Sequence, residues 1–256
     1  MPLPAEILNP EVLLLLAGVA GIAGFIDAIA GGGGLLVLPV LLWAGLTPAQ
    51  ALATNKLQAV FGSFSATIRF VRQGTINLRS MIRAILFSFT GAACGTISVQ
   101  RIHSEALEKL IPILLISFAL YFLFSPRVGD KDAHPRISLT LFSFTIAFVI
   151  GFYDGFFGPG TGSFFAMAFV MLLGYNLIKA TAHAKLLNFV SNFAALLFFI
   201  LGGQVLWKVG LVMAVGQVFG SYLGAHMVLR HGAMLIKPLL VIISLAITLK
   251  LLLFNG

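Results

Sequence analysis

The sequence predicts an all-α, polytopic membrane protein with eight full spans and two short helices that follow glycine breaks. Three observations support this fold class. Hydrophobic residues make up 59% of the 256-residue chain and charged residues only 9%, whereas a soluble domain carries about a quarter of its residues charged. The apolar residues form long continuous runs, not the short alternating segments of a transmembrane β-barrel. The same order of motifs also occurs twice, which predicts two homologous halves.

Eight apolar runs reach spanning length, which is roughly 17 to 25 residues. The first run lacks the basic front of a cleaved signal peptide, so we expect it to remain as a membrane helix. Two further runs, Leu35 to Gly45 and Ser163 to Gly174, are long enough for only about half of the ~30 Å hydrocarbon layer. The eight predicted spans are 12–30, 51–71, 81–100, 106–124, 138–157, 183–201, 209–228 and 235–254.

The repeated motifs place two halves, about 8–125 and 137–254, within a single transmembrane domain that covers residues 1–256. A polar linker, 125–136, joins them. A shared order of motifs over about a hundred residues indicates duplication rather than chance. The matching motifs are Gly24-Phe25-Ile26-Asp27 with Gly151-Phe152-Tyr153-Asp154, Lys56-Leu57 with Lys185-Leu186, and Gly91-x-x-x-Gly95 with Gly220-x-x-x-Gly224.

The distribution of Lys and Arg favours inverted repeats. If the short segments complete broken crossings, each half crosses five times and the second half is inverted. With the amino terminus outside, eleven Lys and Arg then lie inside and five outside. Eight spans with parallel halves give nine against seven. The excess of positive charge on the inner side is larger in the inverted arrangement, as the positive-inside rule requires.

The two glycine breaks are the strongest pointer to a substrate site. Duplicated halves with Gly- or Pro-interrupted segments at matching positions are typical of transporters. The free N–H groups and the dipole at a broken helix favour an anion. The alternative is that these glycines only permit close packing, which is our reading of the two GxxxG pairs, within the chain or in a homodimer. The breaks are Gly31-Gly32-Gly33-Gly34 and Gly158-Pro159-Gly160-Thr161-Gly162.

Asp27 and Asp154 lie four residues before each break, late in apolar spans. A carboxylate there costs several kcal/mol unless it is paired. Two roles stay open for both residues. They are structural, as helix caps or as partners of Lys56 or Lys185, or they carry coupling protons.

Lys56 and Lys185 occupy equivalent positions next to polar stripes. Lys185, Asn188 and Asn192 share one helix side because they follow i, i+3, i+7 spacing. A lysine with neighbouring amides is able to compensate an anion's charge and satisfy its oxygens. The alternative for each lysine is snorkelling to a headgroup, but their duplication favours substrate contact. The expected first-half counterparts are Asn55 and Gln58, followed by Gly62, Ser65 and Arg69.

Several function classes are disfavoured by the composition. The single cysteine, Cys94, and five scattered histidines offer no metal-binding spacing, so no metal or cofactor is expected. The net charge of +8 comes from Lys and Arg between apolar runs, which indicates membrane loops rather than nucleic-acid binding. No GxSG, HExxH or GxGD motif is present, so catalytic residues are not expected.

Three motifs, Gly24 to Pro39 (G-F-I-D-A-x-x-G-G-G-G-L-L-x-x-P), Ala53 to Gln58 (A-T-N-K-L-Q) and Gly151 to Gly162 (G-F-x-D-G-F-F-G-P-G-T-G), carry a family resemblance. They resemble the TauE/SafE sulfite exporter family, also called the sulfonate uptake permease family, over nearly the whole chain. The resemblance implies transport of sulfite, sulfoacetate or other organosulfonates across the bacterial inner (plasma) membrane.

The resulting hypothesis is a secondary transporter of small sulfur-containing anions that works by alternating access. The site is expected between the halves near the midplane, with both breaks, the two lysines and the amides around it. Proton coupling through Asp27 and Asp154 stays open. The alternatives are an anion channel, or a transporter of a different small organic anion; a cation carrier is disfavoured by Lys56 and Lys185.

Overall fold

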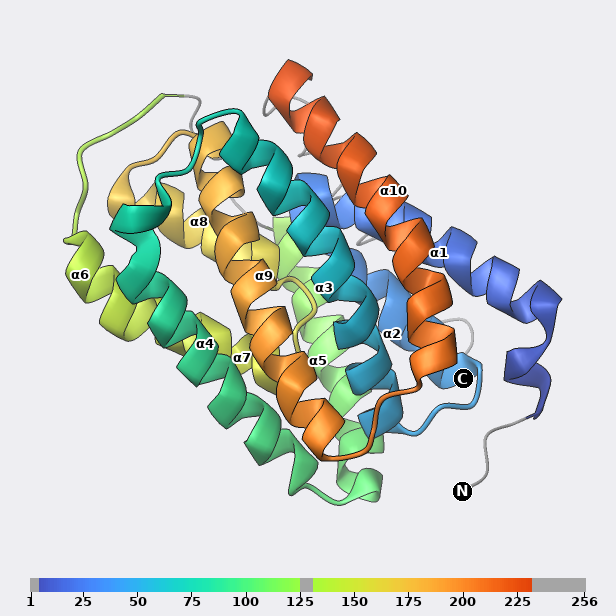
Figure 1. Cartoon of the computed structure of the whole chain (residues 1–256). Coiled ribbons are helices and arrows are strands. Elements are labelled where there is room, and N and C mark those ends of the chain that lie inside the picture. The colour runs from blue at the N-terminus through green and yellow to red at the C-terminus, as the bar shows by residue number, and fades with distance from the viewer. Residues whose placement is uncertain (1–4, 125–130, 232–256) are drawn as a thin grey trace.

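The computed structural model describes residues 5–124 and 131–231, and every regular element in these two ranges is helical (Figure 1). Five helical stretches there are long and apolar enough to cross a membrane. The prediction of an all-α, multi-pass membrane protein is therefore confirmed. The stretches are α1 (Pro10–Ala30), α4 (Leu78–Gln100), the segment Leu139–Phe156, α9 (Leu177–Leu201) and Trp207–Val228 within α10 (Trp207–His231).

The described residues do not establish eight spans. The expected span 51–71 falls within α3 (Pro48–Arg72), a 25-residue helix that is not among the five because polar residues such as Thr54, Lys56 and Gln58 make it less apolar. The expected span 106–124 lies in α5 (Ser104–Phe124). The last expected span, 235–254, lies outside the described residues.

The segment Leu139–Phe156 contains a π-helical turn. It consists of α6 (Leu139–Phe142), the turn η2 (Ser143–Ala147) and α7 (Phe148–Phe156). Such π-turns occur mostly as single bulges within α-helices, and frequently near functional sites. Here the bulge lies on the helix that carries Asp154. A short 3₁₀ turn, η1 (Ala5–Leu8), precedes α1.

Side-chain caps define the starts of the long helices. Thr47 and Gln50 form a capping box at α3, Asn77 caps α4, and the Asn176 side chain accepts from the Lys179 backbone N–H at α9. These bonds satisfy backbone N–H groups that lack a partner in the first turn. Since α9 starts at Leu177 and not near residue 183 as expected, Lys185 lies about two turns inside its helix, as Lys56 does in α3.

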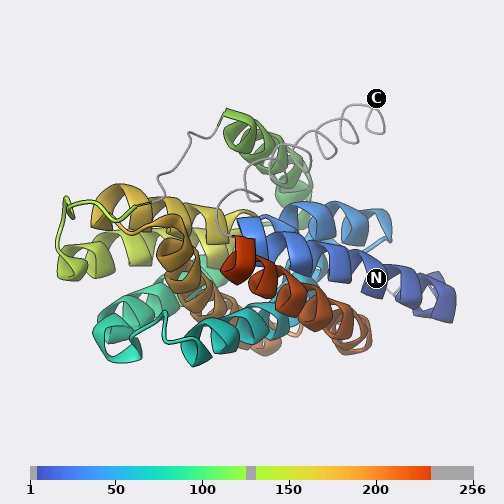
Figure 2. The same cartoon turned by 90° about the horizontal axis from the view of Figure 1, so that it is seen from above.

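The two predicted short helices are α2 (Gly33–Trp43) and α8 (Thr161–Leu173). Gly31 ends α1 in the left-handed conformation, with φ 76°. In both views α2 then turns back from the inner end of α1 (Figures 1 and 2), and a Cβ atom on Gly33 would lie 2.7 Å from the Cβ of Asp27. Helices α1 and α2 therefore form a hairpin, which brings the first glycine break into the interior.

Helices of the first expected half pack mainly against helices of the second half. Helix α1 lies along α10, α4 lies along α7, and α3 and α9 pack against each other between these pairs. In Figure 1, α3 runs upward and α9 runs downward, so these two helices are antiparallel. Buried side chains from α1, α2 and α3 contribute to one apolar core, and buried side chains from α8 and α9 contribute to a second.

Both GxxxG pairs are packing faces within the chain. A Cβ atom on Gly91 or Gly95 of α4 would overlap the carbonyl oxygens of Phe148 and Phe152 in α7. The equivalent overlaps are those of Gly220 and Gly224 of α10 with the carbonyl oxygens of Gly21 and Phe25 in α1. The same close contact is thus built twice, with α1 and α7 as equivalent partners.

We expect Gly220→Ala to destabilise the protein, since the added methyl meets the Gly21 carbonyl. Overpacking of this kind costs about 1–3 kcal/mol, so the melting temperature of the purified protein should fall by several degrees. The matched control is Gly18→Ala, because a Cβ on Gly18 meets nothing within 4 Å. Equal melting temperatures for the two variants would contradict close packing of α10 on α1.

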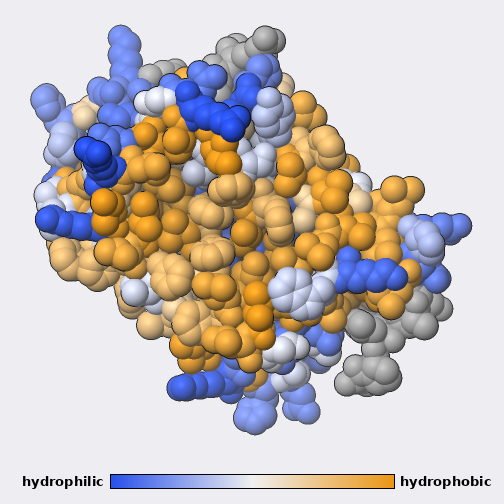
Figure 3. All heavy atoms as spheres, in the orientation of Figure 1, coloured by the Kyte–Doolittle hydropathy of each residue, from blue (hydrophilic) through white to orange (hydrophobic). Residues whose placement is uncertain are grey.

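The surface carries the apolar belt that a bilayer requires. Large apolar side chains are exposed, including Leu14 (76%) and Leu201 (81%). Hydrophobic atoms cover most of the middle of the molecule in Figure 3, and hydrophilic atoms lie mainly around its edges. Trp43 and Trp207 are 77% and 50% exposed near helix ends, and Trp is enriched at membrane–water interfaces.

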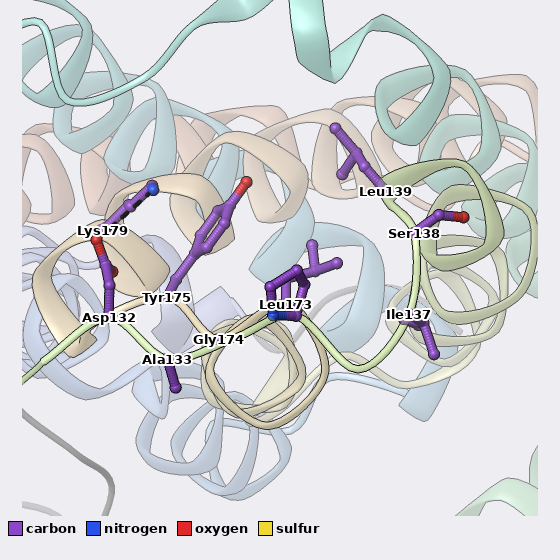
Figure 4. Close-up of a pocket in the computed structure, with 10 residues that line it drawn as sticks. Asp132, Ala133, Ile137, Ser138, Leu139, Leu173, Gly174, Tyr175 and Lys179 are labelled. Carbon is purple, nitrogen blue, oxygen red and sulfur yellow. Dashed lines mark ion pairs between the residues drawn. The ribbon is translucent and has the colours of Figure 1, made fainter.

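The described part of the linker packs over the turn between α8 and α9. The Asp132 carboxylate accepts from the Asn176 backbone N–H at 2.7 Å, and the Ala133 N–H donates to the Gly174 carbonyl at 2.7 Å. A surface cavity of about 350 Å³ lies here, with Tyr175 and Lys179 beside Asp132 (Figure 4). Partial burial, and then the Asp132 charge, raise the pKa of the Tyr175 phenol. None of the predicted site residues lines this cavity.

Candidate functional site

The two glycine breaks, 131 residues apart at their nearest glycines Gly31 and Gly162, meet inside the molecule. A Cβ atom on Gly31 would overlap the backbone nitrogen of Ser163, and one on Gly162 would lie 2.8 Å from the Cα of Gly31. A Cβ on Gly34 would lie 3.3 Å from the Cα of Pro159. Backbones approach this closely only where side chains are absent. The amino-terminal ends of α2 and α8 therefore adjoin each other.

Two ion pairs cross between the expected halves at this junction. The Lys56 Nζ lies 2.8 Å from the Asp154 Oδ1, and both side chains are 1% exposed. The Lys185 Nζ lies 2.9 Å from the Asp27 Oδ2, with side chains 1% and 14% exposed. Each lysine thus pairs with the aspartate of the other half. The four charges sum to zero, and removal of one partner would leave a buried charge without compensation.

Both carboxylates also lie at the start of a short helix. The Asp27 Oδ1 accepts from the Gly33 backbone N–H at 3.3 Å, and Lys185 additionally donates to the Asp27 carbonyl. The Asp154 Oδ1 accepts from the Thr161 hydroxyl at 2.7 Å. The structural role that the sequence left open for the aspartates, capping or pairing with a lysine, is therefore present at both positions.

The other carboxylate oxygen of Asp154, Oδ2, is one of five buried side-chain atoms without a hydrogen-bond partner among the described residues. A buried oxygen without a donor carries a desolvation cost of about 1–3 kcal/mol or more. Asp154 Oδ2 is therefore an atom of this cluster at which an added hydrogen-bond partner would be stabilising.

Three asparagines complete the environment of the lysines. Lys56 donates to the Asn192 Oδ1 at 3.1 Å, and the Asn192 amide donates to the Asn188 Oδ1 at 2.8 Å. Asn55 lies beside the first glycine break, where a Cβ on Gly34 would be 3.5 Å from its Nδ2. The chain of contacts from Lys56 through Asn192 and Asn188 lies on one side of α9, as the i, i+3, i+7 spacing of Lys185, Asn188 and Asn192 predicted.

The predicted first-half stripe divides between two places. Gln58 donates to the Asn55 Oδ1 at 2.9 Å and so belongs to the central cluster. Gly62 instead faces the Gln217 and Ser221 side chains of α10. Ser65 and Arg69 line a groove between α3 and α10. The snorkelling alternative for the two lysines is wrong, since both ammonium groups are buried and paired.

The break backbones are less free than the sequence suggested. The Leu35 N–H donates to the Gly32 carbonyl, and the Phe164 N–H donates to the Gly160 carbonyl. With Asp27 on the Gly33 N–H, several of the amides expected to hold an anion are already engaged. The Asp27 carboxylate therefore lies where an oxyanion would bind at the start of α2, and the Asp154 carboxylate contacts the Thr161 hydroxyl at the start of α8.

Two residues at the junction were not predicted from the sequence. The Tyr153 hydroxyl donates to the Pro159 carbonyl, and the Ser163 hydroxyl donates to the Ala30 carbonyl, which ties α8 to the end of α1. Their first-half counterparts are not polar, so the comparison of halves gave no signal for them. The sequence signal that could have identified them is that Tyr153 directly precedes Asp154 and Ser163 directly follows Gly162.

His183 is hydrogen-bonded and packed within the described helices. Its Nδ1 lies 2.7 Å from the Lys179 carbonyl oxygen, and its ring packs against Tyr175. In residues 5–124 and 131–231, no group of three or more His, Cys, Asp or Glu side chains lies close enough to hold a metal ion.

Comparison with known proteins assigns the chain to a family. The family model for "Sulfite exporter TauE/SafE" matches residues 15–251. A relative from Haemophilus influenzae, named "Probable membrane transporter protein", is 49% identical over 246 residues, which cover 96% of each chain. "Probable membrane transporter protein YfcA" from Escherichia coli K12 is 50% identical over 95% of this chain and 91% of its own length.

A more distant relative has a similar length. "Probable membrane transporter protein YunE" from Bacillus subtilis is 26% identical over 84% of this chain and 87% of its own length. No solved structure matches the chain significantly. The family match covers most of the sequence, and the resemblance drawn from the glycine motifs is confirmed. This chain is a multi-pass membrane protein that belongs to the sulfite exporter TauE/SafE family.

Proposed function

We propose that the protein is a proton-coupled secondary transporter of small sulfur-containing anions, namely sulfite, sulfoacetate or other organosulfonates. The observation that carries the proposal is the pair of crossed ion pairs, Lys56 with Asp154 and Lys185 with Asp27, at the junction of the glycine breaks. The family's description supports a sulfur-containing substrate, and the names of the bacterial relatives support a membrane transporter.

The neutral charge of the cluster supports coupling to protons. We expect a substrate anion that binds Lys56 to compete with the Asp154 carboxylate, whose Oδ1 lies 2.8 Å from the Lys56 Nζ. The displaced carboxylate would be a buried, unpaired charge, which costs several kcal/mol. A proton on Asp154 removes this cost. Anion and proton then bind together, and the cluster keeps its net charge of zero.

The amides and helix starts supply the remaining recognition. Asn188, Asn192 and Asn55 offer donors to the oxygens of a sulfonate or sulfite. The positive ends of the α2 and α8 dipoles, which Asp27 and Asp154 now neutralise, become available to the anion when a carboxylate is protonated. The site residues proposed from the sequence thus act as one cluster. The catalytic chemistry of an enzyme is not part of this proposal.

The proposed conformational cycle rests on inverted repeats. Reciprocal packing of α1 on α10 and of α4 on α7, together with antiparallel α3 and α9, is what two halves related by an axis in the membrane plane would produce (Figure 1). The eight full spans and two short helices predicted from the sequence are compatible with this arrangement. Rocking of one half against the other would expose the central cluster to each side in turn.

The proposed location is the bacterial inner membrane. The relatives described above are bacterial and carry membrane-transporter names. The exposed apolar belt fits a bilayer (Figure 3). No nucleic-acid partner is proposed, and a homodimer would need a surface other than the GxxxG faces, because these pack within the chain.

The test is uptake of radiolabelled sulfite by purified protein in liposomes, with and without an imposed proton gradient. We expect the gradient to drive accumulation, and we expect sulfoacetate to compete better than sulfate. Thiosulfate serves as a further competitor to rank the sulfur oxyanions. The matched control is empty liposomes of the same lipid. Absence of gradient-driven uptake of sulfite and of the competing anions, from protein that retains its melting transition, would overturn the proposal.

A further inference from the structure

A groove of about 380 Å³ lies between α3 and α10, away from the central cluster. Its inner part is apolar and lined by Phe61, Phe64, Ile68 and Val218, while Arg69 and Arg72 lie toward the end of α3. Phe61 and Phe64 are 40% and 46% exposed, so the groove opens to the outside of the helix bundle. It therefore combines an apolar channel with a cationic end.

No Asp or Glu of the described residues lines the cationic end. Neither α3 nor α10 contains an Asp or Glu, and none lines the groove. The Arg69 guanidinium lies 4.6 Å from the Tyr222 ring centroid and contacts the His226 Nδ1. Its Nε is buried and has no hydrogen-bond partner among the described residues. Arg72, one turn further along α3, is exposed.

The position of this end relative to the apolar belt matters. Arg69 and Arg72 are in the last turn of α3, and hydrophilic atoms gather at the upper ends of α3 and α10 in Figure 3. The arginines therefore lie near the edge of the belt, at the level where phospholipid headgroups are found. The apolar lining runs from there toward the middle of the belt.

We propose that this groove binds an anionic phospholipid. The phosphate would lie between Arg69 and Arg72 and would satisfy the unpartnered Arg69 Nε, and an acyl chain would lie along Phe61, Phe64 and Val218. Arginine forms strong, directional bonds with phosphate oxygens. Basic pockets between membrane helices are known to bind anionic headgroups. An anion without an acyl chain would leave the apolar part of the groove unfilled.

Native mass spectrometry of the purified full chain with an equimolar mixture of phosphatidylglycerol and phosphatidylcholine tests the proposal. We expect the wild type to retain phosphatidylglycerol at least several-fold over phosphatidylcholine. Arg72→Gln and Arg69→Gln should each lose most of this preference. Arg79→Gln is the matched control, since Arg79 is an exposed arginine at the start of α4 that does not line the groove.

Soluble competitors separate a lipid from a free anion. Inorganic phosphate and glycerol 1-phosphate should not displace the bound lipid at equal concentration, since neither fills the apolar part of the groove. Because Arg72 is exposed, Arg72→Gln is not expected to disturb folding. Its lipid retention therefore tests the proposal even if Arg69→Gln unfolds. Equal retention of both lipids by the wild type, or unchanged retention in Arg72→Gln, would overturn the proposal. Displacement by phosphate alone would do the same.

Discussion

Lys56→Met should abolish anion uptake and also destabilise the protein, because it leaves the Asp154 carboxylate buried without its partner. Breaking a buried pair in this way costs about 3–5 kcal/mol. We expect a large drop in melting temperature in detergent. The double variant Lys56→Met/Asp154→Asn removes both charges and should recover most of the lost stability, yet uptake should stay absent.

Lys179→Met is the matched control for this experiment. Lys179 lies in the first turn of α9 and faces Asp132 at 3.9 Å, with both side chains well exposed. Exposed pairs of this kind contribute at most about 1 kcal/mol. Its stability and uptake should therefore be close to those of the wild type. Recovery of uptake in the double variant would remove Lys56 from the anion site.

Asp154→Asn should separate anion binding from proton coupling. The amide is still able to accept from Lys56 and Thr161 through its oxygen, but it does not take a proton at neutral pH. The cluster then carries a net positive charge, so the anion should bind at least as tightly as in the wild type. Accumulation driven by a proton gradient should be lost.

Exchange of labelled for unlabelled anion measures the two steps separately. Asp154→Asn should retain exchange while losing gradient-driven accumulation. The control is Asp132→Asn, which alters an exposed carboxylate of the linker. If Asp154→Asn liposomes still accumulate anion in proportion to the proton gradient, Asp154 is not the coupling group.

Much of the central site was predictable from the sequence because each motif occurs in both halves, so that matching residues could be identified by comparison. Asp27, Lys56 and their counterparts Asp154 and Lys185 were selected as matching residues, and the structure brings all four together. The two short helices were also predictable, because the glycine breaks interrupt otherwise apolar runs. In these places local sequence and tertiary structure agree.

The pairing across halves was not predictable. Sequence spacing places Asp27 and Lys56 within one half, but only the folded backbone shows that Lys56 contacts Asp154 and that Lys185 contacts Asp27. The hairpin between α1 and α2 also depends on tertiary contacts, since Gly33 packs back against Ala23 and Asp27. Helix α9 starts before the expected span 183–201 because the Asn176 side chain caps it and a less apolar first turn with Lys179 precedes the apolar run.

The central claim is that anion and proton cross together at the Lys56–Asp154 and Lys185–Asp27 cluster. The most direct test measures anion and proton fluxes simultaneously in the same liposomes, with the anion that competes best against sulfite and a pH-sensitive dye inside. We predict one proton for each negative charge carried, and a rate that does not change with membrane potential. Anion flux that follows the membrane potential without proton movement would contradict the account and indicate a channel.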